Sequence, residues 1–258
     1  MKLLLVNDDG YEAMGIQALM LAFPKEDIFV VAPSLEQSAK GHSFTLNDPL
    51  YVKSFANNCY HLSGTPADCT YFGLNKICPD VDVVLSGINM GANLGTDIYY
   101  SGTVAAAREG FLKGKLSFAV SVLEDVQYSN SRQREMVYAK VAHITRQLIE
   151  YLYQQHTQPA LWNINFPASS MLSSDPPAIV LKPLGHRLYK TGVHEKTDPR
   201  GRTYYWIGGP PLPMEESDTD VYWCERGTVV MTPLQLDCTD YDALRNQQDW
   251  TPEVSGLT

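Results

Sequence analysis

The chain has 258 residues, of which 44% are hydrophobic and 19% are charged, and this composition excludes an intrinsically disordered protein. Its formal net charge of −9 makes it a poor candidate for binding a nucleic-acid polymer, whose phosphate backbone is also negative. No apolar run approaches the roughly 18 residues of a membrane-spanning helix, so we expect no membrane partner.

Short apolar runs predict buried strands that alternate with helices through the first 176 residues. The predicted strands cover residues 2–6, 27–32, 50–55, 60–62, 81–86, 116–122 and 161–166. The predicted helices cover residues 15–23, a segment that begins at Thr65-Pro66, residues 103–112 and residues 132–153. Continuously apolar strands that alternate with helices favour a parallel sheet covered on both faces. The sequence therefore predicts an α/β fold with a Rossmann-like, three-layer core built on a parallel sheet.

The pattern changes after about residue 176, where proline, glycine and aromatic residues become frequent. Short strands are predicted over residues 203–207 and 229–232, followed by a terminal helix near residues 241–250. We therefore divide the chain into an α/β core over residues 1–176 and a β-rich extension with a C-terminal tail over residues 177–258. We expect the extension to serve oligomerisation.

Negative charge is concentrated in the last part of the chain. Residues 215–258 contain ten acidic and two basic residues, whereas residues 1–214 are almost neutral. Residues 182–202 contain six lysines and arginines, which could attract an anionic substrate or contact another subunit. We hypothesise that the acidic tail is exchanged between subunits and meets this basic stretch in the partner. The alternative is a solvated acidic face.

The spacing of cysteine and histidine argues against a zinc site. The five cysteines are scattered without a Cys-x-x-Cys pair, and the six histidines form no His-x-x-x-His pair. We interpret His143, in the middle of a predicted helix, as structural. Unpaired cysteines fit the reduced thiols of a cytoplasmic protein.

Two adjacent carboxylates, Asp8 and Asp9, follow the first predicted strand. In an open α/β sheet, ligands bind beyond the carboxyl ends of the strands, where this pair is expected. Neighbouring carboxylates repel one another unless a hard cation neutralises them, so the pair is a candidate metal site. The alternative is a simple turn at Asp9-Gly10.

A second polar cluster follows the strand that ends before Pro33. Its hydroxyl groups could ligate a hard cation or bind phosphate oxygens, although serines in loops are usually only solvated. The residues of this cluster are Ser34, Ser38, Ser43 and Thr45.

A third cluster follows the strand predicted over residues 81–86. Asn89 and Asn93 supply neutral amide oxygens, which suit magnesium, manganese or calcium rather than zinc. Ser101-Gly102-Thr103 opens a helix, whose unpaired N–H groups and positive dipole end favour phosphate. The alternative is a set of ordinary glycine and asparagine turns. Combined, the three clusters place a hard cation beside a phosphate-binding helix, which indicates metal-assisted hydrolysis of a phosphoester.

Several motifs in a fixed order resemble one known family. The motifs are Asn7-Asp8-Asp9-Gly10, Ala32-Pro33 followed by Ser38, Gly64-Thr65-Pro66-Ala67-Asp68-Cys69, Ser86-Gly87-Ile88-Asn89 followed by Gly91, Asn93 and Gly95, and Tyr100-Ser101-Gly102-Thr103-Val104-Ala105-Ala106-Ala107. They resemble the SurE family of metal-dependent nucleoside-monophosphate phosphatases, which act as 5′- and 3′-nucleotidases. The resemblance covers nearly the whole chain, as far as a strand at Thr232-Pro233-Leu234.

The resemblance implies roles for individual residues. The metal ligands of the family correspond here to Asp8, Asp9, Ser38 and Asn89, and Asp8 and Asp9 are the catalytic candidates. The phosphate-binding residues of the family correspond here to Asn93, Ser101, Gly102 and Thr103. The chain departs from the family at Lys40 and His42, in a variable loop, which leaves the roles of these two side chains open.

The resemblance also implies a reaction, a cofactor and an assembly. We expect one divalent cation per subunit, magnesium or manganese, that binds a phosphate oxygen and lowers the pKa of a water, with Asp8 orienting or deprotonating that nucleophile. The expected substrates are nucleoside monophosphates, and the expected assembly is a homodimer or homotetramer with exchanged C-terminal segments. The alternative is a non-enzymatic nucleotide sensor that uses the same metal pocket. The aromatic residues at 204–206 and 222–223 could stack on a base or form an interface.

Overall fold

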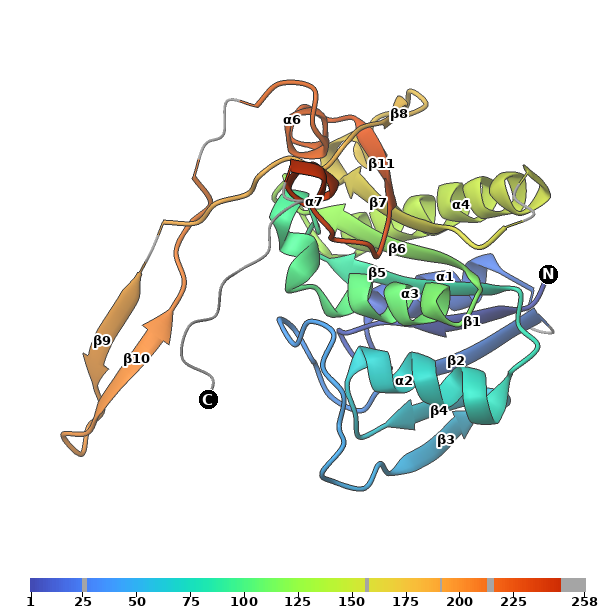
Figure 1. Cartoon of the computed structure of the whole chain (residues 1–258), viewed down its shortest axis with the longest axis horizontal. Coiled ribbons are helices and arrows are strands. Elements are labelled where there is room, and N and C mark those ends of the chain that lie inside the picture. Colours follow the sequence, from blue (N-terminus) through green and yellow to red (C-terminus); the bar gives the residue numbers. More distant parts are fainter. Residues whose placement is uncertain (25–26, 156–157, 191, 213–215, 247–258) are drawn as a thin grey trace.

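A nine-stranded sheet runs through the computed structural model, which describes residues 1–24, 27–155, 158–190, 192–212 and 216–246 (Figure 1). In sheet order the strands are β3 (Val52–Ala56), β4 (Cys59–Leu62), β2 (Ile28–Pro33), β1 (Leu3–Val6), β5 (Val83–Met90), β6 (Leu116–Leu123), β7 (Leu161–Pro167), β11 (Val229–Leu234) and β8 (Ile179–Leu181). Neighbouring strands are parallel except that β3 is antiparallel to β4 and β11 is antiparallel to β7. This arrangement confirms the predicted α/β fold with a mostly parallel sheet.

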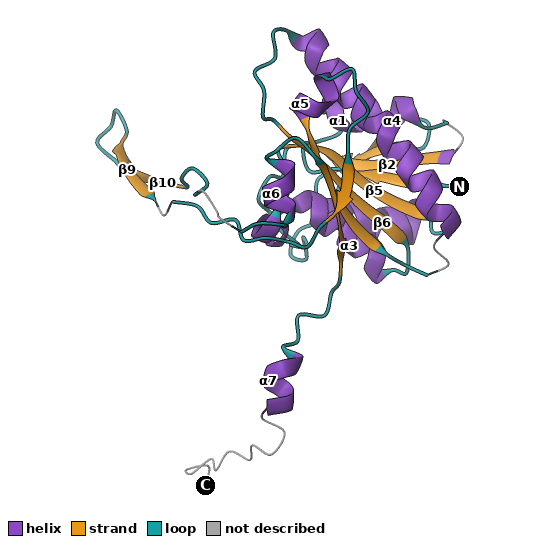
Figure 2. Cartoon of the chain, turned by 90° about the horizontal axis from the view of Figure 1, so that it is seen from above, coloured by secondary structure: helices purple, strands orange, loops and turns teal. Residues whose placement is uncertain are grey.

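Helices cover both faces of the sheet (Figures 1 and 2). Alternate residues of a strand point to opposite faces, and β1 obeys this rule. Leu3 and Leu5 pack in one cluster with α1 (Met14–Ala22) and α4 (Ser131–Gln155). Leu4 and Val6 pack in another with α2 (Pro66–Phe72) and α3 (Gly102–Leu112). The three predicted layers are therefore present. No described helix combines the length and the apolar character needed to cross a membrane.

The sheet continues past the boundary expected at residue 176. β8 and β11 both join it, and Val229 and Val230 are buried there. β9 (Val193–Thr197) and β10 (Thr203–Ile207) form a separate antiparallel hairpin that projects from the body of the molecule (Figure 2). The strands predicted over residues 203–207 and 229–232 are thus confirmed, although they belong to different sheets. The division into two domains stays a prediction.

Several elements differ from the sequence prediction. β5 extends to Met90 instead of ending at residue 86, because its pairing with β6 resumes at Asn89 after an irregularity. The short elements β8, β9, α5 (Ala168–Leu172) and α6 (Asp220–Cys224) were not predicted. Helix α7 (Tyr241–Asn246) accounts for the first part of the terminal helix, and residues 247–250 lie outside the described residues.

The basic stretch meets acidic residues of its own chain. The Lys182 ammonium pairs with Asp218, and the His186 imidazole lies 2.6 Å from a carboxylate oxygen of Glu216. Two cationic or basic side chains of residues 182–202 thus have acidic partners in their own chain, and the exchange of the acidic tail between subunits stays a prediction. Charge alone therefore does not require an exchange between subunits.

The close approach of α1 to β5 generates a prediction about stability. A Cβ atom at Gly15 would lie 1.9 Å from the carbonyl oxygen of Ile88. Gly15→Ala should therefore push α1 away from the sheet and lower the free energy of unfolding, toward the upper end of the roughly 1–3 kcal/mol typical of overpacked cores. The measurement is urea denaturation.

The matched control is Gly114→Ala. Gly114 has φ +75 but nothing within 4 Å of the new Cβ, so the loss should be about 1 kcal/mol from backbone strain alone. Equal losses in the two variants would show that contact with Ile88 does not limit how α1 packs.

Candidate functional site

The predicted site residues lie at one edge of the sheet, at or just beyond the carboxyl ends of neighbouring parallel strands. β1 pairs with both β2 and β5, so the carboxyl ends of the three strands lie together. This edge faces the stem of the hairpin (Figure 1). A cavity of about 530 Å³ opens there. The predicted site residues that line it are Asp8, Ser38, Asn89, Asn93 and Ser101.

Asp8 is buried beneath the start of α3. The Thr103 hydroxyl donates a 2.6 Å hydrogen bond to Asp8 Oδ1, and the Thr103 backbone amide also bonds to this carboxylate. A Cβ at Gly102 would lie 3.0 Å from Asp8 Oδ2, so glycine allows the helix to approach the carboxylate this closely. Burial raises the pKa of Asp8, and the Thr103 hydrogen bonds oppose that rise. The first turn of α3 thus holds Asp8 in one orientation.

Asp9 is half-buried, and the backbone amide of Met90 donates to its Oδ2 at 3.2 Å. Burial and the neighbouring charge of Asp8 raise the pKa of Asp9 to about 7. Asp9 lines an adjacent cavity of about 260 Å³ together with Glu36 and Arg134. The two carboxylates therefore stand at the boundary between two cavities.

Of the other two predicted metal ligands, Ser38 is exposed and Asn89 is half-buried. The Ser38 hydroxyl donates to Glu36 Oε1 at 2.8 Å, and the Asn89 amide nitrogen donates to the Gly91 carbonyl at 2.7 Å. Among the described residues, no three side chains of the His, Cys, Asp and Glu types form a metal-binding group. The predicted ligand set differs from such a group, because it combines two carboxylates with a hydroxyl and an amide.

Asn93 is buried and fixed by polar residues of β6 and β7. Its side-chain nitrogen donates to the Ser121 hydroxyl at 2.8 Å, and its backbone amide donates to Asn165 Oδ1 at 2.8 Å. Its carbonyl accepts from Asn163 Nδ2 at 2.8 Å and from Asn165 Nδ2 at 3.1 Å. Sequence analysis missed Ser121, Asn163 and Asn165, although polar residues inside apolar strands are a detectable signal.

The predicted phosphate-binding residues at the start of α3 have different surroundings. Ser101 is the N-cap, and its hydroxyl accepts from the Val104 amide at 3.0 Å. Thr103 is fully buried, and its hydroxyl contacts Asp8 rather than the cavity. The Thr103 side chain is therefore placed to orient a carboxylate.

The loop that carries Ser38 is attached to helices α2 and α3. His42 Nε2 lies 3.2 Å from Oε2 of the buried Glu109, and the Gly41 amide donates to the Tyr100 carbonyl at 3.0 Å. The Thr45 amide donates to Asp68 Oδ1 at 3.1 Å. The role of His42, which the sequence left open, is therefore structural, because its side chain contacts α3. Lys40, in contrast, is exposed.

Three residues that sequence analysis did not select also line this cavity. They are Asp97 in the 3₁₀ helix η3 (Gly95–Tyr99), Tyr100, and Tyr189 at the base of the hairpin. The Tyr189 hydroxyl donates to the Asp97 carboxylate at 2.9 Å, and Arg187 Nη1 lies 3.0 Å from Asp97 Oδ2. Tyr100 opens a motif that was recognised, and Asp97 lies between two such motifs. Nothing in the local sequence around Tyr189 indicates that it reaches the site.

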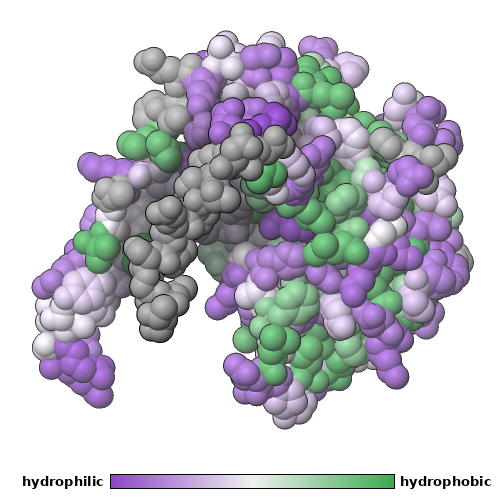
Figure 3. All heavy atoms as spheres, in the orientation of Figure 1, coloured by the Kyte–Doolittle hydropathy of each residue, from purple (hydrophilic) through white to green (hydrophobic). Residues whose placement is uncertain are grey.

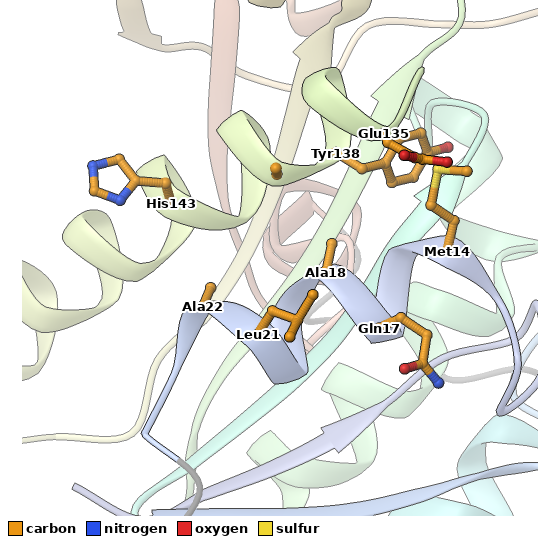
Figure 4. A pocket seen from close by; sticks show the side chains of 9 residues that line it. Met14, Gln17, Ala18, Leu21, Ala22, Glu135, Tyr138 and His143 are labelled. Carbon is orange, nitrogen blue, oxygen red and sulfur yellow. The ribbon is translucent and has the colours of Figure 1, made fainter. Parts of the chain in front are cut away.

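A second large cavity, about 540 Å³, lies between α1 and α4 (Figure 4). Met14, Ala18 and Leu21 give it an apolar lining, and none of the predicted site residues is there. His143 lies at one end of this cavity and is exposed, and its interpretation as a structural residue stays a prediction.

Comparisons with known proteins identify relatives of this chain. A family model described as Survival protein SurE matches residues 3–191. Two relatives named 5′-nucleotidase SurE align along nearly their whole length. The one from Desulforudis audaxviator is 37% identical, covering 99% of this chain and 100% of its own, and the one from Vibrio cholerae is 40% identical, covering 98% of each.

A solved structure gives the same result. The SurE protein from Aquifex aeolicus superposes with a TM-score of 0.78 at 34% sequence identity, covering 96% of this chain and 99% of that one. Family model, relatives and solved structure all extend over the strands that carry the candidate site. The chain therefore belongs to the SurE family.

Proposed function

We propose that this protein is a 5′-nucleotidase that hydrolyses nucleoside monophosphates to nucleoside and phosphate with the help of a divalent cation. The activity is supported by the names of the relatives, whose alignments cover nearly the whole chain. The observation that carries the proposal is the placement of Asp8, buried between the end of β1 and the start of α3, with Asp9 beside it.

The chemistry of the carboxylate pair fits a hard cation. Burial raises the pKa of both Asp8 and Asp9, and neither forms an ion pair with a cationic side chain of the described residues. Asp8, Asp9, Ser38 and Asn89 offer only oxygen donors, which magnesium and manganese prefer. We propose one such ion per subunit. When bound, it would supply Lewis-acid stabilisation of a phosphoryl oxygen.

The residues of the chain itself would orient and stabilise the reacting group. The Thr103 hydroxyl holds one face of Asp8, which leaves the other carboxylate oxygen to orient or deprotonate the attacking water. The N-terminal end of α3, beginning at Gly102, favours the negative charge that develops on the phosphoryl group. Asn93, held rigidly by β6 and β7, would bind a phosphate oxygen without needing to reorganise.

The proposed activity is tested by phosphate release from 5′-AMP, 3′-AMP and the other nucleoside monophosphates, with magnesium, manganese or chelator. The wild type should release phosphate only with metal. Asp8→Asn and Asp9→Asn should each lower kcat by about 10²-fold or more, because each removes a charge from the cation site without changing its volume.

Asp48→Asn is the matched control, since Asp48 is exposed and should leave kcat unchanged. Near-wild-type turnover in either site variant with limiting magnesium would contradict the role of that residue. A wild type that binds AMP but releases no phosphate would instead support the nucleotide-sensor alternative.

A second prediction follows from the pKa of Asp9, raised from its ordinary value of 3.8 to about 7. A carboxyl group with a raised pKa binds its proton more tightly in the folded state, so losing that proton destabilises the fold. The metal-free protein should therefore lose stability as pH rises from about 4 to about 7. A cation stabilises the ionised form, so magnesium should raise Tm more at pH 8 than at pH 5.

The measurement is thermal unfolding at the two pH values, with and without magnesium. Asp9→Asn should remove most of the pH dependence of the metal effect. An equal magnesium-induced rise in Tm at both pH values in the wild type would place the cation away from Asp9.

We also propose that the chain assembles as a homodimer or homotetramer through the β9–β10 hairpin. Every residue of both strands is exposed, including Trp206 and Ile207, and the arm stands clear of the body (Figure 3). Exposed aromatic and aliphatic side chains that gather on one strand, as Tyr205, Trp206 and Ile207 do, are typical of an interaction site. Truncation at Met214 would not test this proposal, because it would remove β11 from the sheet.

The double variant Trp206→Ser with Ile207→Ser should lower the mass measured by light scattering toward that of one 28.8 kDa chain. Leu21→Ser with Leu112→Ser, two exposed leucines on other elements, is the matched control and should keep the wild-type mass. A monomeric wild type, or a double variant with the wild-type mass, would refute the role of the hairpin.

A further inference from the structure

The loop between β2 and β3, residues 34–51, carries Ser38 in a backbone conformation that needs support from outside the loop. Ala39, the residue after Ser38, has φ +58. Alanine is disfavoured in this left-handed region, because its Cβ approaches the following carbonyl oxygen. Such a conformation persists only where the surrounding structure fixes it. The contacts that hold this loop therefore decide where the Ser38 hydroxyl lies.

Backbone hydrogen bonds hold the loop on both sides of Ser38. On the N-terminal side, the Gln37 amide donates to the Asp8 carbonyl at 2.8 Å. On the C-terminal side, the Gly41 amide donates to the Tyr100 carbonyl at 3.0 Å. Ser38 thus lies on a short stretch of chain between the end of β1 and the start of α3.

A buried pair of side chains adds a further anchor on the C-terminal side. His42 Nε2 lies 3.2 Å from Glu109 Oε2, and only 21% and 6% of the two side chains are exposed. A buried carboxylate is costly unless it is paired, and an apolar pair of similar volume would often stabilise a fold at least as well. Stability alone is therefore a weak reason for this pair. Its specific effect is to fix which part of the loop meets α3.

Helix α3 connects this anchor to the rest of the site. Glu109 lies about two turns after Gly102, so both residues face the same side of the helix. A Cβ at Gly102 would lie 3.0 Å from Asp8 Oδ2. One face of α3 therefore packs against Asp8 at its start and holds the Ser38 loop about two turns later.

We propose that the His42–Glu109 pair is a positioning element for the divalent cation, which holds the loop where the Ser38 hydroxyl reaches the ion bound by Asp8 and Asp9. This inference rests on the proposed function and adds two residues that set its metal affinity. Neither side chain lines the cavity, so the pair acts through Ser38 and not by touching the ion or the substrate. Residues that orient a metal ligand in this way typically contribute about 10–100-fold in affinity.

The test measures the binding of manganese to the full chain by calorimetry, without substrate. His42→Ala should weaken binding by about tenfold, because the loop loses its side-chain anchor and Ser38 moves away from the ion. The manganese concentration that gives half-maximal phosphate release from 5′-AMP should rise by the same factor, whereas kcat at saturating manganese should stay close to that of the wild type. Lys40→Ala is the matched control, since Lys40 is exposed in the same loop and its variant should keep the wild-type affinity.

A double variant separates positioning from stability. His42→Ala leaves the Glu109 carboxylate buried without its partner, so this variant should have a lower Tm. Adding Glu109→Gln removes the buried charge and should recover most of the Tm, but it does not restore the anchor, so manganese binding should stay about tenfold weaker. Recovery of Tm and affinity together would show that the pair only stabilises the fold, and would overturn the inference.

A double-mutant cycle with Ser38 provides the second test. Ser38→Ala should weaken manganese binding, and adding His42→Ala should cause no further loss, because the position of the loop no longer matters without the hydroxyl. Additive losses, or wild-type affinity in either single variant, would overturn the inference. A wild type that binds manganese but releases no phosphate would refute the nucleotidase function, while the binding measurements would still decide the role of the pair.

Discussion

The site depends on one buried contact, between the Asp8 carboxylate and the first turn of α3. The Thr103 hydroxyl reaches Asp8 Oδ1 at 2.6 Å, and Gly102 leaves the space that this approach requires. Desolvation works against an ionised Asp8, and Asp9 adds a second negative charge beside it. The central strand β1 therefore ends in two neighbouring carboxylates whose ionised forms are destabilised by burial and by mutual repulsion. A hard cation bound between them would stabilise the ionised forms.

The second half of the site depends on contacts from the C-terminal part of the chain. Asp220 is fully buried, and its carboxylate accepts hydrogen bonds from the backbone amides of Gly95 and Gly185, at 2.8 and 2.7 Å. These bonds tie α6 to the loop after Asn93 and to the base of the hairpin. The arm that we propose for assembly thus begins next to Tyr189, which lines the candidate site.

Regular elements with continuous apolar runs were predictable, because burial on both faces leaves a strong local signal. All seven strands predicted in the first 176 residues are present, as are the four helices. The signal failed for β8 and β9, whose residues are mostly exposed and whose pairing depends on distant partners. It also failed at Gly87, where β5 continues through an irregularity that periodicity does not reveal.

The sequence by itself determined the α/β class, the family, and the polar residues at the carboxyl ends of β1, β2 and β5. Those assignments rest on local patterns: apolar runs, paired carboxylates and a helix N-cap. Only the tertiary structure decided that the Thr103 hydroxyl contacts Asp8 and that Tyr189 lies 2.9 Å from Asp97, 92 residues away in the chain. Such contacts depend on how the strands are ordered and how the C-terminal segments return to the sheet, and no local pattern encodes that return.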